Sequence, residues 1–187
     1  YSLYAALLNK VKTYAFEPSA ANYFILNRNI KVNHFAERVS AFCLALGDKT
    51  ELSHLYMGDE SEELGGALNQ FGASVDWDGK PFKPVFTQGM IGYSIDDFIA
   101  AFDIDFPNHL KIDVDGIEDK VIGGCAKTLA DSRVKSILIE LNVERAEYSE
   151  GIISIIENSG FKLEARRHAE MFDSGPWSAF YNHIFVR

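Results

Sequence analysis

The chain has 187 residues, of which 47% are hydrophobic and 24% are charged, and its formal net charge is −9. This length suits one domain that buries roughly 70% of its unfolded surface, so we expect residues 1–187 to form a single globular domain. The acidic balance argues against a nucleic-acid binder, which needs a basic face. No apolar run approaches the roughly 18–20 residues that cross a bilayer, which argues against a membrane protein.

The cysteine and histidine residues argue against a zinc site. Cys43 and Cys125 fall in apolar segments without metal-ligand spacing, and the five histidines form no HxxxH or HxH pair. We expect two buried free thiols, which are typical of a reducing compartment, and therefore a cytoplasmic protein.

The first predicted elements are a helix, a strand and a second helix. Residues 2–9 are rich in Ala and Leu and predict a helix, and the short apolar run 13–16 predicts a strand. This strand ends at Glu17-Pro18, and proline suits the start of the helix that we predict over 20–29.

The next segments predict strands that surround a long excursion. Residues 37–46 predict a strand, Gly47-Asp48 a turn, and residues 52–57 a strand that pairs back as a hairpin partner. The Gly-rich and acidic segment 58–83 is weakly periodic, so we expect a long surface excursion. A further strand is predicted over 83–89.

The second half alternates between helices and strands. Ser94 is a predicted N-cap for a helix over 94–101, with Asp96 and Asp97 in its first turn. The remaining predicted elements are a strand over 110–114, a helix with an apolar stripe over 117–129, a buried strand over 136–141, a helix over 150–158 and a closing antiparallel strand pair over 161–167 and 179–186. Gly123-Gly124 inside the predicted helix suggests close packing of this helix against the sheet. The alternation predicts an α/β fold with a mixed sheet.

Carboxylates follow two of the predicted strands. In an open α/β sheet, ligands bind outside the carboxyl ends of the strands. Glu17 lies at such an end, where its two oxygens can accept both hydroxyls of a ribose; the alternative is a solvated residue of the first helical turn. Asp48, after the strand over 37–46, either meets the adenine edge of a nucleotide-like cofactor or simply forms a turn.

The densest group of carboxylates lies in KIDVDGIE, residues 111–118. Its carboxylates can orient a hydroxyl, accept a proton or hold Mg²⁺, and Gly116 permits a sharp turn. A capping box, with Asp115 at the N-cap and Glu118 at N3, is the alternative interpretation of those two residues, and it leaves Asp113 unexplained.

Other polar residues extend this group. Lys111 on the same apolar strand needs a partner, and we expect an ion pair with a nearby carboxylate. Glu140 and Asn142 end the strand over 136–141, so together with Asp113 they can form an oxygen-rich pocket compatible with Mg²⁺, or a satisfied polar strand end. The candidate catalytic residues are Asp113 and Glu140. Four aromatic residues either line a substrate pocket or belong to the core: Trp77, Phe82, Phe86 and Trp177.

Several segments, in order along nearly the whole chain, resemble the FkbM-type S-adenosylmethionine-dependent methyltransferases. They are YSLYAALL, VKTYAFEPSAANYFILNRNIKVN, SIDDF, HLKIDVDGIEDKVIGGCAKTL and ILIELN, and the ending YNHIFVR also suits the family. The resemblance implies a Rossmann-like class I methyltransferase fold with a seven-stranded, mostly parallel sheet. It also implies S-adenosylmethionine as the cofactor and O-methylation of a sugar or natural-product hydroxyl, so the expected partner is a small-molecule or glycan acceptor.

The resemblance also implies roles for individual residues. Glu17 would bind the cofactor ribose, Asp48 would lie close to the adenine, and Asp113 would lie near the methyl donor and the substrate. The cofactor-binding candidates are therefore Glu17, Asp48 and Asp113.

The family's first strand and Gly-rich loop should precede Tyr1, and this sequence lacks them. We therefore expect a domain cut from a longer protein. Two other functions are compatible with these patterns. One is a non-catalytic Rossmann-like interaction module, a degenerate methyltransferase. The other is an NAD-dependent oxidoreductase, for which the sequence offers no hydride-transfer residues.

Overall fold

The computed structural model of the chain describes residues 1–8, 11–58, 68–168 and 170–187. The chain forms two compact units. Unit 1 comprises residues 1–46, 51–76 and 80–92, and unit 2 comprises residues 47–50, 77–79 and 93–187. No helix in the described ranges is both long enough and apolar enough to span a membrane.

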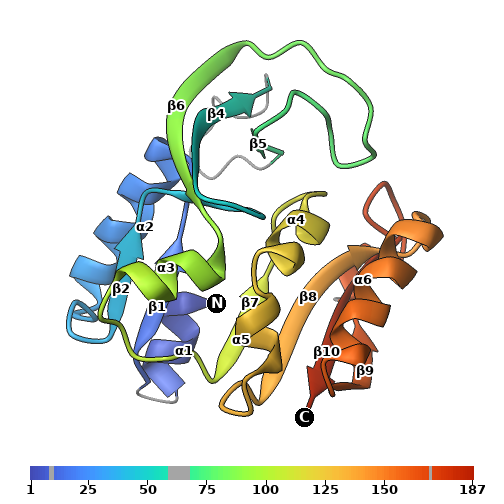
Figure 1. Cartoon of the computed structure of the whole chain (residues 1–187). Helices are drawn as coiled ribbons and strands as arrows, with labels where there is room; N and C mark the ends of the chain where they lie inside the picture. The colour runs from blue at the N-terminus through green and yellow to red at the C-terminus, as the bar shows by residue number, and fades with distance from the viewer. Residues whose placement is uncertain (9–10, 59–67, 169) are drawn as a thin grey trace. The chain divides into compact units, whose positions relative to one another are not determined.

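Unit 1 begins with a parallel strand pair beside two helices (Figure 1). The elements are α1 (Ser2–Leu8), β1 (Thr13–Phe16), α2 (Ala20–Val32) and β2 (Val39–Phe42). Their small core contains Ala6, Ala15, Ile30 and Val39. Ser19 starts α2, because its side chain accepts a hydrogen bond from the N–H of Asn22. The predicted helix–strand–helix order is confirmed, and α2 runs three residues beyond the predicted end at 29.

The rest of unit 1 is a four-stranded sheet in the order β3-β6-β4-β5. Its strands are β3 (Ala45–Leu46), β4 (Glu51–Met57), β5 (Gln70–Phe71) and β6 (Phe86–Tyr93). The single strand predicted over 37–46 is wrong, because the chain leaves the β1–β2 sheet after Phe42 and pairs with β6 from Ala45. The predicted hairpin of residues 52–57 with that strand is also wrong, since β4 pairs antiparallel with β5 and β6.

Two strands of this sheet depend on contacts between distant residues. The sequence predicts no strand at β5, which lies within segment 58–83, and it predicts the strand corresponding to β6 over 83–89 rather than 86–93. The buried Phe71 ring packs against Gly92 of β6, where an added Cβ would come within 2.4 Å of the ring. Residues 59–67 of the predicted surface excursion lie outside the described residues.

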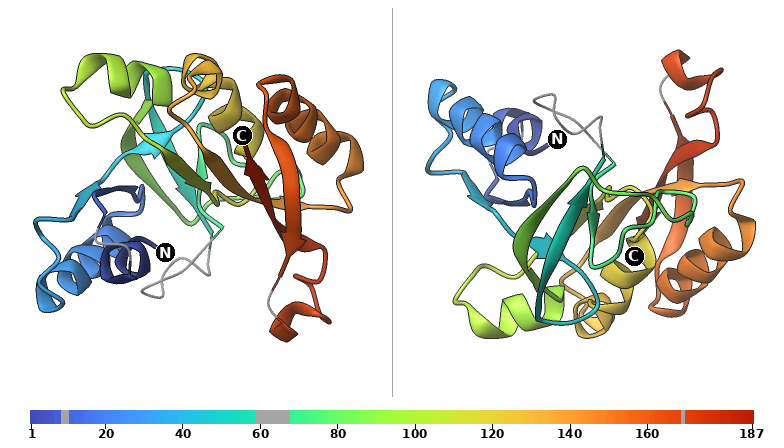
Figure 2. Two further views of the ribbon diagram at one scale, coloured as in Figure 1. Left: turned by 90° about the horizontal axis from the view of Figure 1, so that it is seen from below. Right: turned by 90° about the horizontal axis from the view of Figure 1, so that it is seen from above.

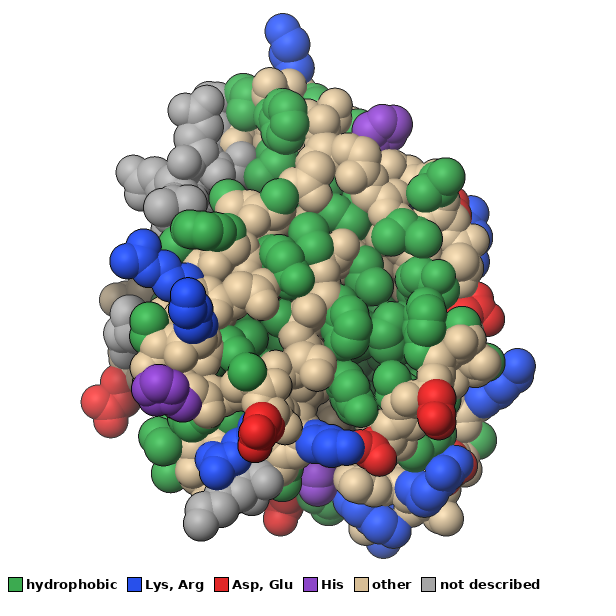
Figure 3. All heavy atoms as spheres, turned by 90° about the vertical axis from the view of Figure 1, so that its left-hand side faces the viewer, with side chains coloured by type: hydrophobic (Ala, Val, Ile, Leu, Met, Phe, Trp, Pro, Cys, Tyr) green, Lys and Arg blue, Asp and Glu red, His purple; other side chains and the backbone are tan. Residues whose placement is uncertain are grey.

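Large apolar side chains stay exposed on several elements of unit 1. Figure 3 shows hydrophobic side chains gathered on the face that it draws. The most exposed ones of unit 1 are Tyr1, Tyr4, Leu7, Phe24, Val32, Leu52 and Phe86. These side chains contribute surface rather than core.

Unit 2 contains a mixed sheet in the order β7-β8-β10-β9. The elements of this unit are α3 (Ile95–Ala101), β7 (His109–Ile112), α4 (Glu118–Gly123), α5 (Ala126–Ala130), β8 (Ser136–Asn142), α6 (Ala146–Asn158), β9 (Lys162–Arg167), the 3-10 helix η2 (Glu170–Phe172) and β10 (Phe180–Val186). Strands β7 and β8 are parallel, and β10 pairs antiparallel with both β8 and β9. This confirms the predicted closing pair.

Three helices of unit 2, α4, α5 and α6, lie on one face of this sheet (Figures 1 and 2). The helix predicted over 117–129 is broken into α4 and α5, with Gly124 as the C-cap of α4. A Cβ on Gly124 would come 2.0 Å from the carbonyl oxygen of Gly47. The close approach predicted for the Gly pair therefore exists, but it is made to the turn at Gly47 rather than to the sheet.

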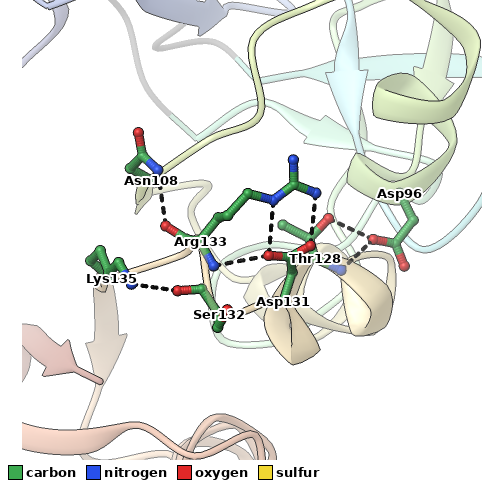
Figure 4. A network of polar contacts seen from close by, with 7 residues as sticks. All are labelled: Asp96, Asn108, Thr128, Asp131, Ser132, Arg133 and Lys135. Atoms are coloured by element: carbon green, nitrogen blue, oxygen red, sulfur yellow. Dashed lines mark hydrogen bonds and ion pairs between the residues drawn. The ribbon is translucent and has the colours of Figure 1, made fainter.

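The N-terminus of α5 is capped by a side chain from another helix (Figure 4). The carboxylate of Asp96 on α3 accepts hydrogen bonds from the backbone N–H groups of Lys127 and Thr128, both at 2.8 Å, and from the Thr128 hydroxyl at 2.6 Å. Cys125, at the N-cap position of α5, makes no such bond with its own side chain. Asp96 therefore satisfies the donors that a local cap would satisfy.

Candidate active site

In unit 1, Glu17 lies where β1 ends and α2 is about to begin. Its backbone N–H donates to the carbonyl oxygen of Phe42 at 3.0 Å, which extends the parallel pairing with β2 by one hydrogen bond. Its Oε1 atom accepts the N–H of Ser19 at 2.9 Å. These two contacts hold the half-buried carboxylate at the carboxyl end of the strand, where the sequence placed it.

Gln88 of β6 fixes the turn that carries Glu17. The Gln88 amide nitrogen donates to the carbonyl oxygen of Pro18 at 2.8 Å, and its Oε1 atom accepts the N–H of Ala20 at 3.0 Å. Sequence reasoning missed this residue, because 70 residues separate it from Pro18 and no local motif marks it.

Both cysteines are free thiols; Cys125 is buried as expected, whereas Cys43 is only partly buried. Burial raises the pKa of Cys43, and the nearby charge of Glu17 raises it further. Burial also raises the pKa of Cys125 to about 12, with a contribution from Asp96. Cys125 is buried and stays protonated at neutral pH, so it is not an activated nucleophile.

In unit 2, Lys111 and Asp113 form the ion pair predicted for Lys111. The Nζ atom of Lys111 lies 2.5 Å from Oδ2 of Asp113. The Asp113 side chain is 41% exposed and the Lys111 side chain 22%, so the pair lies at the surface end of β7 with its lysine more covered than its carboxylate. The lysine positions the carboxylate just beyond the carboxyl end of the strand.

Glu140 of the neighbouring strand β8 joins this pair. The two predicted catalytic residues are neighbours, since the carboxylate of Asp113 acts on the protonation of Glu140. Burial raises the pKa of Glu140 to about 7, and the negative charge of Asp113 adds to the shift, whereas Lys111 opposes it. Near neutral pH, Glu140 can therefore exist in either protonation state, as a group that exchanges protons requires.

The alternative interpretation of Asp115 and Glu118 as a capping box is wrong. Helix α4 starts at Glu118, and its N-cap residue is Ile117, which makes no side-chain cap. Asp115 and Gly116 instead adopt positive φ angles of 54° and 111°. Such a backbone bends the chain away from the helical path, so Asp115 cannot cap α4.

Asp113, Glu140 and Asn142 are expected from the sequence to form either an oxygen-rich pocket or a satisfied polar strand end, and Asn142 follows the second alternative. The Oδ1 atom of buried Asn142 accepts the N–H of Glu144 at 3.0 Å, which uses that oxygen inside the turn after β8. In the part of the chain that the structure describes, no group of three or more His, Cys, Asp and Glu residues is arranged to hold a metal ion.

Asp48 belongs to unit 2 and follows Gly47 in the predicted turn. The Gly47 N–H donates to the carbonyl oxygen of Tyr93 at 2.9 Å. An added Cβ on Gly124 would lie 3.1 Å from the Asp48 Cα atom. The turn is thus packed tightly against the junction of α4 and α5, and a role of Asp48 in binding adenine stays a prediction.

The four aromatic residues singled out in the sequence fall into different units. In unit 2, Trp77 and Trp177 form a cluster with Phe180, with ring centroids 5.4–5.8 Å apart. Phe82 and Phe86 belong to unit 1, and Phe86 is 60% exposed. The two tryptophans of unit 2 therefore pack together.

In unit 2 the parallel pair of β7 and β8 is followed by β10, which lies between β8 and β9 and is antiparallel to both. This strand order is that of a class I methyltransferase. The helix-flanked parallel pair of unit 1, with its acidic strand end, belongs to the same fold class. The family model described as Methyltransferase FkbM domain matches residues 1–163. The chain belongs to this family.

A solved structure supports the fold. The crystal structure of Methyltransferase FkbM from Methylobacillus flagellatus KT matches with a TM-score of 0.57 and 16% sequence identity, over 99% of this chain and 40% of that chain. This chain therefore spans less than half the length of that protein, and at this identity the match shows the fold alone. No curated protein matches the chain significantly.

Proposed function

We propose that this chain is the catalytic part of an S-adenosylmethionine-dependent methyltransferase that methylates a hydroxyl oxygen of a small-molecule or glycan acceptor. Membership of the FkbM methyltransferase family supports the methyl transfer. The observation that carries the proposal is the Asp113–Glu140 carboxylate pair, which lies just past the last parallel pairing of β7 with β8, because methylation of a hydroxyl requires that its proton be removed.

The residues at the end of β1 fit the ribose of this cofactor. A ribose presents two adjacent hydroxyl donors, and the Glu17 carboxylate offers two acceptor oxygens, one of which the N–H of Ser19 already orients. Gln88 holds the same turn from β6. Glu17 would therefore bind the ribose, and Asp48 is the candidate for the adenine. S-adenosylmethionine, when bound, supplies an activated methyl group.

The two carboxylates, Glu140 and Asp113, would have different roles. Glu140, with its pKa near 7, would accept the proton of the acceptor hydroxyl through its carboxylate. Asp113, paired with Lys111, would orient that hydroxyl and keep the pKa of Glu140 high through its negative charge. Because the hydroxyl oxygen attacks the methyl carbon in line, positioning contributes much of the rate.

Calorimetric titration of S-adenosylhomocysteine into the full-length protein tests the proposal. We expect saturable one-to-one binding by the unaltered protein. Glu17→Ala should weaken this binding by about 1–3 kcal/mol, or about 5- to 150-fold, because charge-assisted hydrogen bonds to the ribose are lost.

Glu37→Gln is the matched control, because Glu37 is an exposed acidic residue of the same unit and its removal should leave the affinity unchanged. Unchanged affinity in Glu17→Ala would contradict the ribose assignment. A folded full-length protein that binds no S-adenosylhomocysteine would contradict the methyltransferase proposal and favour a non-catalytic module.

A further inference from the structure

The loop after β7, which carries Asp113, has an unusual backbone. Asp115 and Gly116 adopt φ angles of 54° and 111° in succession. An Asp with positive φ is uncommon, and such a conformation persists only where surrounding contacts impose it. Gly116 also lies against Trp77, since an added Cβ would come 2.8 Å from the Trp77 Cα atom. The loop is therefore shaped by contacts with residues outside it.

Glu118 and Tyr148 supply such contacts. The Glu118 side chain is buried, with 5% of the residue exposed, and its Oε1 atom accepts the N–H of Gly116 at 2.9 Å. Its Oε2 atom accepts the hydroxyl of Tyr148 on α6 at 2.8 Å. The same hydroxyl oxygen accepts the N–H of Asp119 at 3.2 Å. One carboxylate thus connects the loop to a helix about thirty residues away.

The tyrosine is itself fixed from its other side. The Arg145 guanidinium lies over the Tyr148 ring, 3.8 Å from its centroid, and donates a hydrogen bond to the carbonyl oxygen of Trp77 at 2.8 Å. Trp77 is the residue against which Gly116 packs. The contacts therefore close a circuit within unit 2, from Gly116 through Glu118, Tyr148, Arg145 and Trp77 back to Gly116.

We propose that Glu118 and Tyr148 are positioning residues, which hold the loop after β7 in the conformation that places Asp113 for its reaction. The inference rests on the proposed methyltransferase function and adds two residues that act through the loop rather than on the acceptor. Burial raises the pKa of Glu118, and burial together with the Glu118 charge raises the pKa of Tyr148. Tyr148 therefore stays a hydrogen-bond donor at neutral pH.

Tyr148→Phe tests the inference, because it removes one hydroxyl and keeps the ring under Arg145. Tyr181→Phe is the matched control, since Tyr181 also carries an arginine, Arg166, 5.0 Å from its ring centroid, and lies outside the circuit. In the full-length protein, two quantities are measured: amide hydrogen exchange at Gly116, and the kcat, KM and S-adenosylhomocysteine affinity of methyl transfer.

In Tyr148→Phe we expect exchange at Gly116 to become about tenfold faster or more, because Tyr148 no longer holds the Glu118 carboxylate that accepts the Gly116 N–H. We expect kcat to fall about 10- to 100-fold, with the cofactor affinity and the shape of the pH profile unchanged, as misplacement of a reacting group predicts. Glu118→Gln keeps an oxygen for the Gly116 N–H and should retain more activity than Glu118→Ala. Tyr181→Phe should match the unaltered protein.

Unchanged exchange at Gly116 in Tyr148→Phe would overturn the inference, and so would faster exchange with unchanged kcat. A loss of cofactor affinity equal to the loss in kcat would also overturn it. If the unaltered protein neither binds S-adenosylhomocysteine nor transfers methyl groups, the proposed function fails and the inference falls with it. Because the exchange measurement needs no activity, it distinguishes a failure of the loop contacts from a failure of the proposed function.

Discussion

Glu140 is the residue whose protonation should control the proposed reaction. A base must be ionised to accept a proton, and burial beside Asp113 raises the pKa of Glu140 to about 7. We therefore expect kcat to fall as the pH decreases through about 7. Glu140→Gln should lower kcat by about 10²- to 10⁴-fold and remove this acidic limb, because the amide neither ionises nor accepts the proton. The pH dependence of kcat measures both effects.

Asp113→Asn separates the two carboxylates. This change removes a negative charge that raises the pKa of Glu140, so the acidic limb should move to lower pH while it persists. Glu164→Gln is the control, since Glu164 is an exposed acidic residue on β9. An acidic limb that stays at the same pH in Asp113→Asn and in Glu140→Gln would show that neither carboxylate sets it.

At the scale of elements, the break between α4 and α5 depends on Gly124. A Cβ at this position would lie 2.0 Å from the carbonyl oxygen of Gly47 and 3.0 Å from the Ser94 Cβ, so the backbone must move to accept it. We expect Gly124→Ala to lower the free energy of unfolding by about 1–3 kcal/mol, as overpacking does, measured by urea denaturation.

The neighbouring glycine provides a matched control. A Cβ on Gly123 would meet only the Asp48 Cβ, at 3.9 Å, which is an ordinary contact. Because Gly123 is the last residue of α4, Gly123→Ala should be neutral or stabilising by up to about 1 kcal/mol. Equal stabilities of the two variants would contradict the packing assigned to Gly124.

The elements differ in how well the sequence predicts them. Local patterns placed β1, α3 and β8 within a residue, since short apolar runs and the Ser94 cap decide these elements. The break at Gly124 and the pairing of β4 with β5 and β6 depend on residues distant in sequence, which the periodicity of a segment cannot predict. The Lys111 partner followed from an unmatched charge on an apolar strand. In contrast, Gln88 and Tyr148 act from other elements, and no local motif marked them.

For the whole molecule, buried ionisable groups and net charge determine how stability varies with pH. Glu118 and Glu140 have raised pKa values in the folded state, so these two side chains bind more protons in the folded chain than in the unfolded chain above about pH 4.5. Their contribution to stability is therefore lost as the pH rises through the raised values. The pKa of His183 is lowered by burial, so stability is also lost as the pH falls below its unfolded pKa, about 6.5.

The net charge acts in the same direction as the two glutamates at high pH. With a charge of −9 at pH 7 and a pI of about 5.0, self-repulsion of the folded chain grows as the pH rises. We therefore expect the thermal midpoint to be about 2–6 °C higher at pH 6 than at pH 8, measured by circular dichroism.

Glu140→Gln should reduce this difference, whereas Glu164→Gln, which removes the same charge at the surface, should reduce it less. Added salt, at 0.5 M, screens surface repulsion but not burial, so a difference that vanishes in salt would assign it to net charge alone. A midpoint that rises between pH 7 and pH 8, above the unfolded pKa of His183, would contradict the raised pKa of Glu140.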